Sequence, residues 1–267
     1  GGSQKRKSRD KGYKEGRKPI RLNRDVRTLS EAEEVENKVW QQTRLVEYLN
    51  HLPIIQTVLP AVEADDLISL TVQHPKYKGW QKVIVSSDKD FFQLCDEETV
   101  LFRPIQKQIL NSKRIVEDFG IHPTNFALAR AIVGDRSDNL AGIRGIGLST
   151  VAKRLPFLAE DKFCSIDELV NYCEETENEL KAYKSIVENK ATIEHNYKMM
   201  QLYAPQMSIQ SKIVVKESVE KFDFNFNKTA ILGMMIEDGF GELNWEDLKT
   251  HLNKISTECL DDATELF

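Results

Sequence analysis

The stretch "IIQTVLPAVEADDLISL", residues 54–70, decides the fold class of this chain. Its first six residues are rich in apolar and β-branched side chains, which indicates a short buried strand over residues 54–59. The apolar run "LISL" then indicates a helix over residues 67–73, and "KVIVSS" indicates a second strand over residues 82–87. The order strand, helix, strand is a βαβ unit, so we expect an α/β protein with a parallel sheet flanked by helices.

The character of the sequence changes near Asn111. Before it, Ser30 and Glu33 have the spacing of a capping box that opens a helix, "DFFQLC" indicates a helix, and "VLF" and "QIL" indicate short strands. After it, Ser112 and Gly120 are the expected cap and stop of one helix, a second helix ends at Gly134, and further helices follow. We therefore expect two domains, residues 1–110 with the sheet and residues 111–267 with mostly helices.

Charge is distributed unevenly along the chain. Residues 1–27 contain eleven Lys or Arg against three Asp or Glu, a net charge of +8. Because the whole chain has a net charge of −5, the remaining residues carry −13. Such a cationic loop commonly binds polyanions, although a solvated charged loop is the simpler alternative. The basic residues expected to bind DNA are Lys5, Arg6, Lys7 and Arg9.

Several classes of protein are disfavoured by composition. No apolar run approaches the ~18 residues that span a bilayer, and no signal peptide is visible, so we expect no membrane association. The four cysteines lie far apart without a C-x-x-C pair, which disfavours a zinc site or a disulfide framework and favours a cytoplasmic setting.

Five carboxylates follow the two predicted strands directly. Glu63, Asp65 and Asp66 come after the first strand, and Asp88 and Asp90 come after the second. Ligands bind at the carboxyl ends of strands in open α/β sheets, so these side chains should converge at one edge. Acidic residues also cap helix N-termini, but a helix start needs one or two such residues rather than three.

Asp135 and Asp138 follow the end of the helix "FALARAIV", where the partial negative charge of the helix terminus opposes them. A divalent cation would stabilise these two carboxylates and the five others. Because no His or Cys stands near, the set favours Mg²⁺, with Mn²⁺ as a substitute. Seven carboxylates suit two ions about 4 Å apart, an arrangement that hydrolyses phosphodiester bonds.

The segment "GIRGIG" places Gly142, Gly145 and Gly147 in a short turn before a helix. Glycine lets the backbone approach a ligand closely, and Ser149 and Lys153 add a donor and a positive charge in the following helix. Such a hairpin can hold a nucleic-acid backbone irrespective of sequence, whereas the simpler alternative is a tight turn between helices.

The motifs "VEADD", "SSDKDFFQL" and "GDRSDNLAGIRGIGLSTVAKRL", in this order, resemble the 5′-nuclease superfamily. It comprises flap endonucleases, the 5′-nuclease domains of bacterial DNA polymerase I and phage 5′→3′ exonucleases. The chain is most similar to the T-even-type phage flap nucleases called ribonuclease H. The resemblance implies a PIN-like catalytic domain in residues 1–110, with a helical arch that begins in residues 1–29, and a helix-three-turn-helix region in residues 111–267.

The resemblance also implies roles for individual residues. The seven carboxylates correspond to the family's metal ligands, and the glycine hairpin corresponds to the part that holds duplex DNA and often K⁺. Lys14 and Arg17 correspond to basic arch residues that steer the scissile phosphate. Beside them, the aromatic ring of Tyr13 is a candidate for stacking on a base. The family's first strand–helix–strand segment has no counterpart here, which implies a truncated sequence or one piece of a split protein.

The end of the chain, "DDATELF", resembles the short tails that dock phage replication proteins onto sliding clamps, although a frayed terminus is an equal alternative. The whole sequence thus predicts a monomeric, Mg²⁺-dependent 5′ nuclease that acts on DNA flaps and RNA–DNA primers in replication, in the host cytoplasm if phage-encoded. Two other functions stay open: a non-catalytic junction-DNA-binding module and a PIN-like single-strand ribonuclease.

Overall fold

The chain forms two compact units in the computed structural model. The structure describes residues 4–13, 15, 30–176, 181–222, 226–239, 244, 246–251 and 253–254, without the side chains of Lys5 and Glu31. Unit 1 comprises residues 1–19 and 57–220, and unit 2 comprises residues 20–56 and 221–267. The expected boundary at residue 110 falls inside unit 1, because the helices after it pack on the same core as the sheet. A division of function at that boundary stays a prediction.

The sheet of unit 1 has three strands, β1 (Lys82–Val85), β2 (Thr99–Arg103) and β3 (Gln108–Leu110), in the order β1-β2-β3. β1 and β2 are parallel, as expected, whereas β2 and β3 are antiparallel, so the sheet is mixed. Residues 104–107 alone connect β2 to β3, and a connection this short can join only antiparallel strands.

The predicted strand over residues 54–59 is absent; these residues form a loop before α3 (Ala64–Val72). A strand is stable only beside another strand that shares its backbone hydrogen bonds. Within the described ranges, the edge of β1 opposite β2 pairs with no strand, and the chain passes from unit 2 into unit 1 between Gln56 and Thr57. An apolar, β-branched run was therefore insufficient to specify a strand here.

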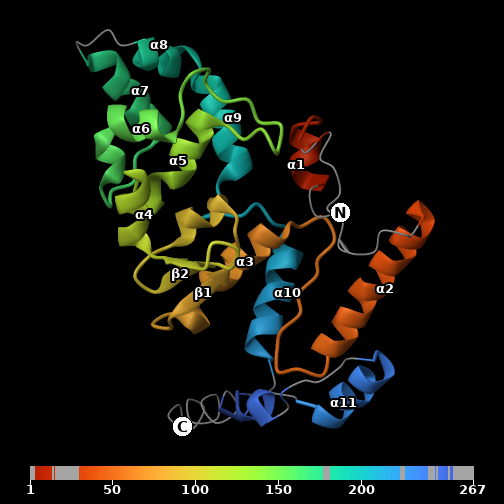
Figure 1. Ribbon diagram of the computed structural model, residues 1–267. Coiled ribbons are helices and arrows are strands. Elements are labelled where there is room, and N and C mark those ends of the chain that lie inside the picture. The colour runs from red at the N-terminus through yellow and green to blue at the C-terminus, as the bar shows by residue number, and fades with distance from the viewer. Residues whose placement is uncertain are drawn as a thin grey trace. The chain divides into compact units, whose positions relative to one another are not determined.

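The helices after the sheet build one hydrophobic core with it (Figure 1). They are α4 (Ser112–Phe119), α5 (Pro123–Val133), α6 (Leu148–Arg154), η3 (Pro156–Ala159), α7 (Ile166–Glu175), α8 (Lys181–Glu188) and α9 (Lys190–Met200). Helix α5 is central: it packs on α9 and on the 3-10 helix η2 (Lys89–Leu94). The rings of Phe92 and Phe126 meet there edge to face, with centroids 5.0 Å apart. Because η2 follows β1 directly, this packing fixes the strand end that carries Asp88 and Asp90.

The caps of α4 and α5 agree with the sequence in most details. Gly120 ends α4 with φ 66°, and His122 caps α5 by accepting the backbone N–H of Thr124. The cap of α4 is Asn111 rather than the expected Ser112, because the Asn111 amide oxygen accepts the N–H of Arg114 at 2.9 Å. The Ser112 hydroxyl instead lies 3.0 Å from Nε2 of His122.

Three further elements complete unit 1. Residues Gln4–Arg9, expected to be a loop, form the short helix α1. Helix α3 packs on α10 (Ile209–Glu220) through Leu67, Met207 and Val215. The 3-10 helix η1 (Pro75–Tyr77) lies between α3 and β1 in the chain.

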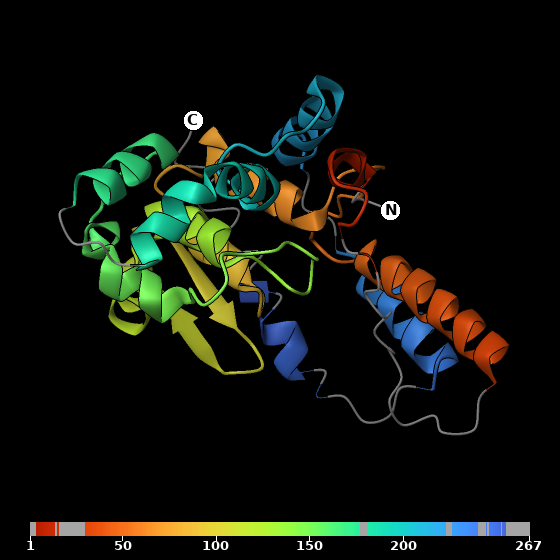
Figure 2. The ribbon, with the colours of Figure 1, turned by 90° about the horizontal axis from the view of Figure 1, so that it is seen from above.

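Unit 2 pairs α2 (Glu31–Leu49) with α11 (Lys228–Glu237), as Figure 2 shows. The predicted capping box of Ser30 and Glu33 opens α2. Asp238, just after α11, accepts hydrogen bonds from Arg44 at 2.7 Å and from the Tyr48 hydroxyl at 2.6 Å. None of the helices in the described ranges is long and apolar enough to cross a membrane.

Candidate functional site

The first carboxylate group consists of Glu63, Asp65 and Asp66 at the start of α3. Glu63 is the N-cap residue, but its side chain makes no capping hydrogen bond. Glu63 and Asp66 are buried, with 8% and 9% of their surface exposed, so their charges require compensation. Helix capping therefore does not explain Glu63, and the compensating charge comes from elsewhere in the chain.

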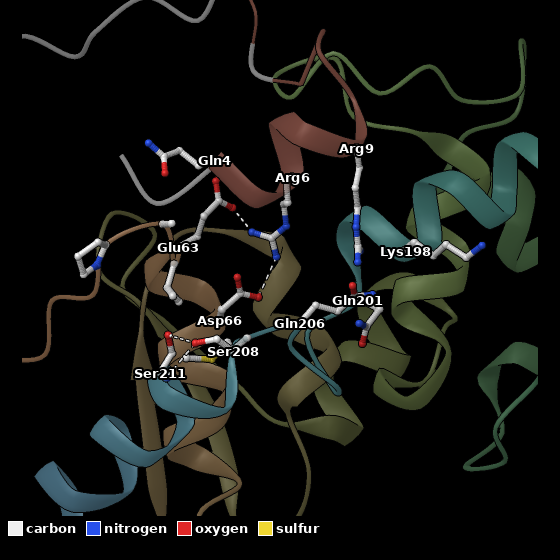
Figure 3. A pocket seen from close by; sticks show the side chains of 14 residues that line it. Gln4, Arg6, Arg9, Glu63, Asp66, Lys198, Gln201, Gln206, Ser208 and Ser211 are labelled. Carbon is white, nitrogen blue, oxygen red and sulfur yellow. Dashed lines mark hydrogen bonds and ion pairs between the residues drawn. The ribbon is translucent and has the colours of Figure 1, made fainter.

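The guanidinium of Arg6, in α1, lies among these three carboxylates (Figure 3). Its Nη1 donates to Glu63 and lies 3.7 Å from Asp65, while Nη2 donates to Asp66 at 3.0 Å. Burial alone would lower the pKa of Arg6, but the three carboxylates outweigh burial and raise it. The pKa of Asp66 is raised by burial despite Arg6. Arg6 therefore supplies positive charge among these three carboxylates.

Tyr13 joins the first carboxylate group to Asp138. Its hydroxyl lies 3.3 Å from Oε2 of Glu63 and 3.2 Å from Oδ2 of Asp138. Burial, together with the neighbouring carboxylates, raises the pKa of Tyr13. The ring is only 3% exposed and packs against Leu140, Met199 and Met200. The expected stacking of Tyr13 on a base would need an exposed ring, so it does not fit this conformation.

The second carboxylate group consists of Asp88, Asp90 and Asp135. The guanidinium of Arg130, in α5, lies beside it. Arg130 donates to Asp90 at 3.0 Å through Nε and to Asp135 through Nη2. Asp88 caps η2 by accepting the N–H of Asp90 at 3.0 Å. The segments after β1 and after α5 thus both bring a carboxylate, Asp90 and Asp135, to one guanidinium.

The two partly buried carboxyls of this group, Asp90 and Asp135, have opposite pKa shifts. Burial raises the pKa of Asp90 to about 6, because the nearby charge of Arg130 only partly offsets it and Asp88 adds repulsion. Burial also acts on Asp135, but hydrogen bonds from Ser137 and the charge of Arg130 outweigh it and lower the pKa of Asp135. The Ser137 bonds explain how an acid tolerates its position after a helix C-terminus.

The seven carboxylates therefore stand in two groups, with Asp138 joined to the first through Tyr13. Their donor atoms are all oxygen, which suits Mg²⁺ or Mn²⁺. Within the described part of the chain, however, no three His, Cys, Asp or Glu side chains are arranged to hold a metal ion. Arg6 and Arg130 form ion pairs with these carboxylates instead, so binding of a cation would require rearrangement around both guanidinium groups. Metal ligation by these residues stays a prediction.

The glycine hairpin has two kinds of glycine. A Cβ on Gly142 would lie 1.7 Å from the carbonyl oxygen of Val133, and one on Gly134, where φ is 75°, would lie 2.3 Å from the nitrogen of Gly142. Gly142 thus serves close backbone packing inside the protein rather than contact with a ligand. Gly145, with φ 82°, and Gly147 face open space, which leaves their backbone accessible.

Four other residues predicted to contact DNA have exposed side chains. Ser149 and Lys153 lie on the surface of α6, and Lys7 and Arg9 lie on the surface of α1. Lys14, Arg17, the side chain of Lys5 and the C-terminal tail lie outside the described residues.

Arg130 was missed by sequence reasoning. Its signal was available: it is the one charged residue in "FALARAIV", an otherwise apolar and buried stretch. A charge on such a helix requires a partner, and the carboxylates after β1 and α5 were the candidates. The contact of Arg6 with α3 had no comparable signal, because 57 residues separate Arg6 from Glu63.

Comparison with known proteins identifies relatives that share this architecture. Residues 1–120 match the family model of the 5'-3' exonuclease N-terminal resolvase-like domain. A 5'-3' exonuclease of Aquifex aeolicus is 30% identical over 152 residues, which cover 57% of this chain and 48% of that protein. A thermostable DNA polymerase I of Thermus aquaticus is 29% identical over 144 residues, which cover 54% of this chain and 16% of that protein. The chain thus spans about half the length, or less, of the curated relatives it matches.

Solved structures support the same fold. A structure of T5 5'-exonuclease with bound zinc superimposes with a TM-score of 0.53 at 15% identity, covering 79% of this chain and 71% of that one. A complex of the bacteriophage T5 flap endonuclease with DNA and metal ions superimposes with a TM-score of 0.52 at 13% identity, covering 79% and 71%. At these identities the likeness concerns the fold, which is PIN-like.

Proposed function

Because this chain belongs to the 5′ nuclease superfamily, we propose that it hydrolyses phosphodiester bonds in nucleic acids as a divalent-metal-dependent 5′ nuclease. The observation that carries this proposal is the pairing of acids from distant segments. Asp90 and Asp135 meet at one guanidinium, and Glu63 and Asp138 meet at one hydroxyl. Carboxylates gathered in this way need cations, and phosphodiester hydrolysis uses cations held by carboxylates.

The proposed roles follow from position. The two carboxylate groups would hold two Mg²⁺ ions, or Mn²⁺ in their place, and the bound metal supplies an activated water and stabilises the leaving oxygen. The accessible backbone of Gly145 and Gly147 would hold the duplex, with K⁺ as a further ligand there. Lys14 and Arg17 would steer the scissile phosphate.

We further propose that the substrates are 5′ flaps of DNA and RNA–DNA primers, and that the protein acts as a monomer in the cytoplasm. The exposed basic side chains of Lys7 and Arg9 on α1 and of Lys153 on α6 support a nucleic-acid substrate, because exposed positive charge attracts the phosphate backbone. Docking of the C-terminal tail on a sliding clamp is part of the same proposal.

The test is an end-labelled 5′-flap cleavage assay with Mg²⁺ or EDTA, using Asp88→Asn and Asp135→Asn. We expect the wild-type protein to cut only with Mg²⁺. Each variant should lose at least about 100-fold of the cleavage rate while it retains most of its DNA affinity, since metal-supported charge stabilisation contributes several kcal/mol to such reactions. Full cleavage by both variants would refute the assigned roles.

A second candidate function is a non-catalytic module that binds junction DNA. It is favoured by the two arginines that pair with the carboxylates and by the absence, in the described ranges, of a group arranged to hold metal. This candidate predicts binding of forked DNA without cleavage at any Mg²⁺ or Mn²⁺ concentration. The PIN-like single-strand ribonuclease is disfavoured, because a duplex-holding hairpin has no use on such substrates.

A further inference from the structure

A groove of about 590 Å³ lies in unit 1, where the end of α3 and the 3-10 helix η1 face α10. Its lining is mostly apolar and includes Leu70, which packs against the core cluster between α3 and α10. The ammonium group of Lys76, in η1, donates to the carbonyl oxygen of Val219 at 2.8 Å. This bond joins η1 to the last turn of α10, so the core and a hydrogen bond together hold the two walls of the groove.

Helix α10 extends the apolar surface beyond the groove. Ile209 and Ile213 are 79% and 42% exposed, and a spacing of four residues places them on one face of the helix. Lys212, Lys216 and Glu220 line the groove and continue this face in steps of three or four residues. Two exposed isoleucines with charged residues beside them form the kind of surface to which the apolar face of another helix binds.

The charges around the groove favour an acidic partner. Within the described ranges, Lys212 forms no ion pair, and Lys76 donates to a carbonyl rather than to a carboxylate. Lys216 lies 3.7 Å from Glu220, which is the one acidic residue of the lining. A nucleic-acid strand is negative along its whole length and would be repelled by Glu220. A peptide can instead place its carboxylates at the lysines alone, so the pattern fits a peptide better.

The groove is separate from both carboxylate groups. The first group lies at the start of α3, and the nine residues of this helix put about 13 Å between that group and the end that borders the groove. The second group follows the carboxyl end of β1, whereas η1 precedes the amino end of this strand. A partner bound in the groove would therefore leave both carboxylate groups accessible.

We propose that this groove, with the exposed face of α10, binds an acidic amphipathic helix of a partner protein. Apolar side chains of that helix cover Ile209 and Ile213, and its carboxylates pair with Lys212 and Lys216. Opposite Glu220 the helix carries a neutral or basic residue, because two carboxylates there would repel each other. Binding of this kind does not depend on nuclease activity.

The test measures, by fluorescence anisotropy, the binding of a labelled synthetic helix that has leucine on one face and glutamate beside it. A scrambled peptide of the same composition and a peptide with lysine in place of glutamate are the control ligands. We expect Lys212→Glu and Ile209→Gln each to weaken binding of the acidic helix about fivefold. Lys113→Glu is the matched control, because it reverses the same charge at an exposed position of α4 outside the groove, and it should weaken binding less than about twofold.

The lysine-bearing peptide separates a lost contact from a lost fold. It should bind Lys212→Glu more tightly than the wild-type protein, which a misfolded variant would not do. Absence of saturable binding, equal affinity for the ordered and scrambled peptides, or equal losses in Lys212→Glu and Lys113→Glu would each overturn the proposal. Tighter binding of a single-stranded oligonucleotide than of the acidic helix, lost in Lys212→Glu, would assign the groove to nucleic acid. A dimer of the free protein that Ile209→Gln dissociates would assign the face to a second copy, and either result would overturn the proposal as well.

Discussion

The two carboxylate groups of unit 1 each pair with one arginine, and the two arginines differ in origin. Arg130 comes from the last turn of α5, a helix buried along most of its length, and lies five residues before its partner Asp135. Arg6 comes from the six-residue helix α1, and Tyr13 is the one buried hydrophobic residue in the described residues 4–13. The second group is thus stabilised by the core itself, whereas the first depends on a segment with little apolar anchorage.

This difference predicts that Arg130 contributes most to folding stability. In Arg130→Met, the partly buried Asp90 loses its counter-charge beside Asp88 and Asp135, so the free energy of unfolding should fall by about 3 kcal/mol. Urea unfolding followed by circular dichroism measures the change.

The control for this prediction is Asp90→Asn in the Arg130→Met background. Removing the uncompensated charge should restore part of the lost stability, since the two residues are coupled. A double variant less stable than Arg130→Met would contradict the proposed cause.

Replacing Arg6 should cost less than replacing Arg130. In Arg6→Met, α1 can leave and let water reach Glu63 and Asp66, so we expect the free energy of unfolding to fall by about 1.5 kcal/mol. The same urea titration measures it, with Lys11→Met as the control for loss of a positive charge. A loss equal to that of Arg130→Met would remove the distinction between the two groups.

The smallest expected effect concerns metal affinity. Under the proposed function, a metal ion at Glu63 and Asp66 must displace Arg6, so Arg6→Met should bind Mn²⁺ about fivefold more tightly, or about 1 kcal/mol. The loss of the free-Mn²⁺ signal in electron paramagnetic resonance measures binding without reference to cleavage. Weaker binding by Arg6→Met would mean that Arg6 supports the metal instead of competing with it.

Local patterns predicted the parts of the fold that depend on local physics. Helix α3, strand β1, the capping box of Ser30 and Glu33 and the stop at Gly120 followed from periodicity and capping chemistry. The carboxylates were predicted as a site because acids after predicted strands and after a helix C-terminus are conspicuous in sequence, and their role as metal ligands stays a prediction. The strand expected over residues 54–59 failed because its existence depends on a neighbouring strand, which no local pattern encodes.

Non-local contacts account for the rest of what was missed at the site. Arg6 reaches Glu63 across 57 residues, and Tyr13 reaches Asp138 across 125, and neither separation follows a helical or strand period. The groove between η1 and α10 likewise combines residues from distant segments. The contact of Arg130 is the exception that the sequence could have predicted. A single charged residue in an apolar helix needs a partner, and Asp135 lies only five residues away.

The contact between Gly134 and Gly142 has a mechanical consequence. Because neither position leaves room for a Cβ, the backbone of the glycine hairpin lies directly against the end of α5 and the loop that begins at Asp135. Under the proposed function, a duplex seated on the hairpin would be held at a constant offset from Asp135. The distance along the duplex from the hairpin contact to the cleavage position would then be set by Gly134 and Gly142, two residues that have no side chain.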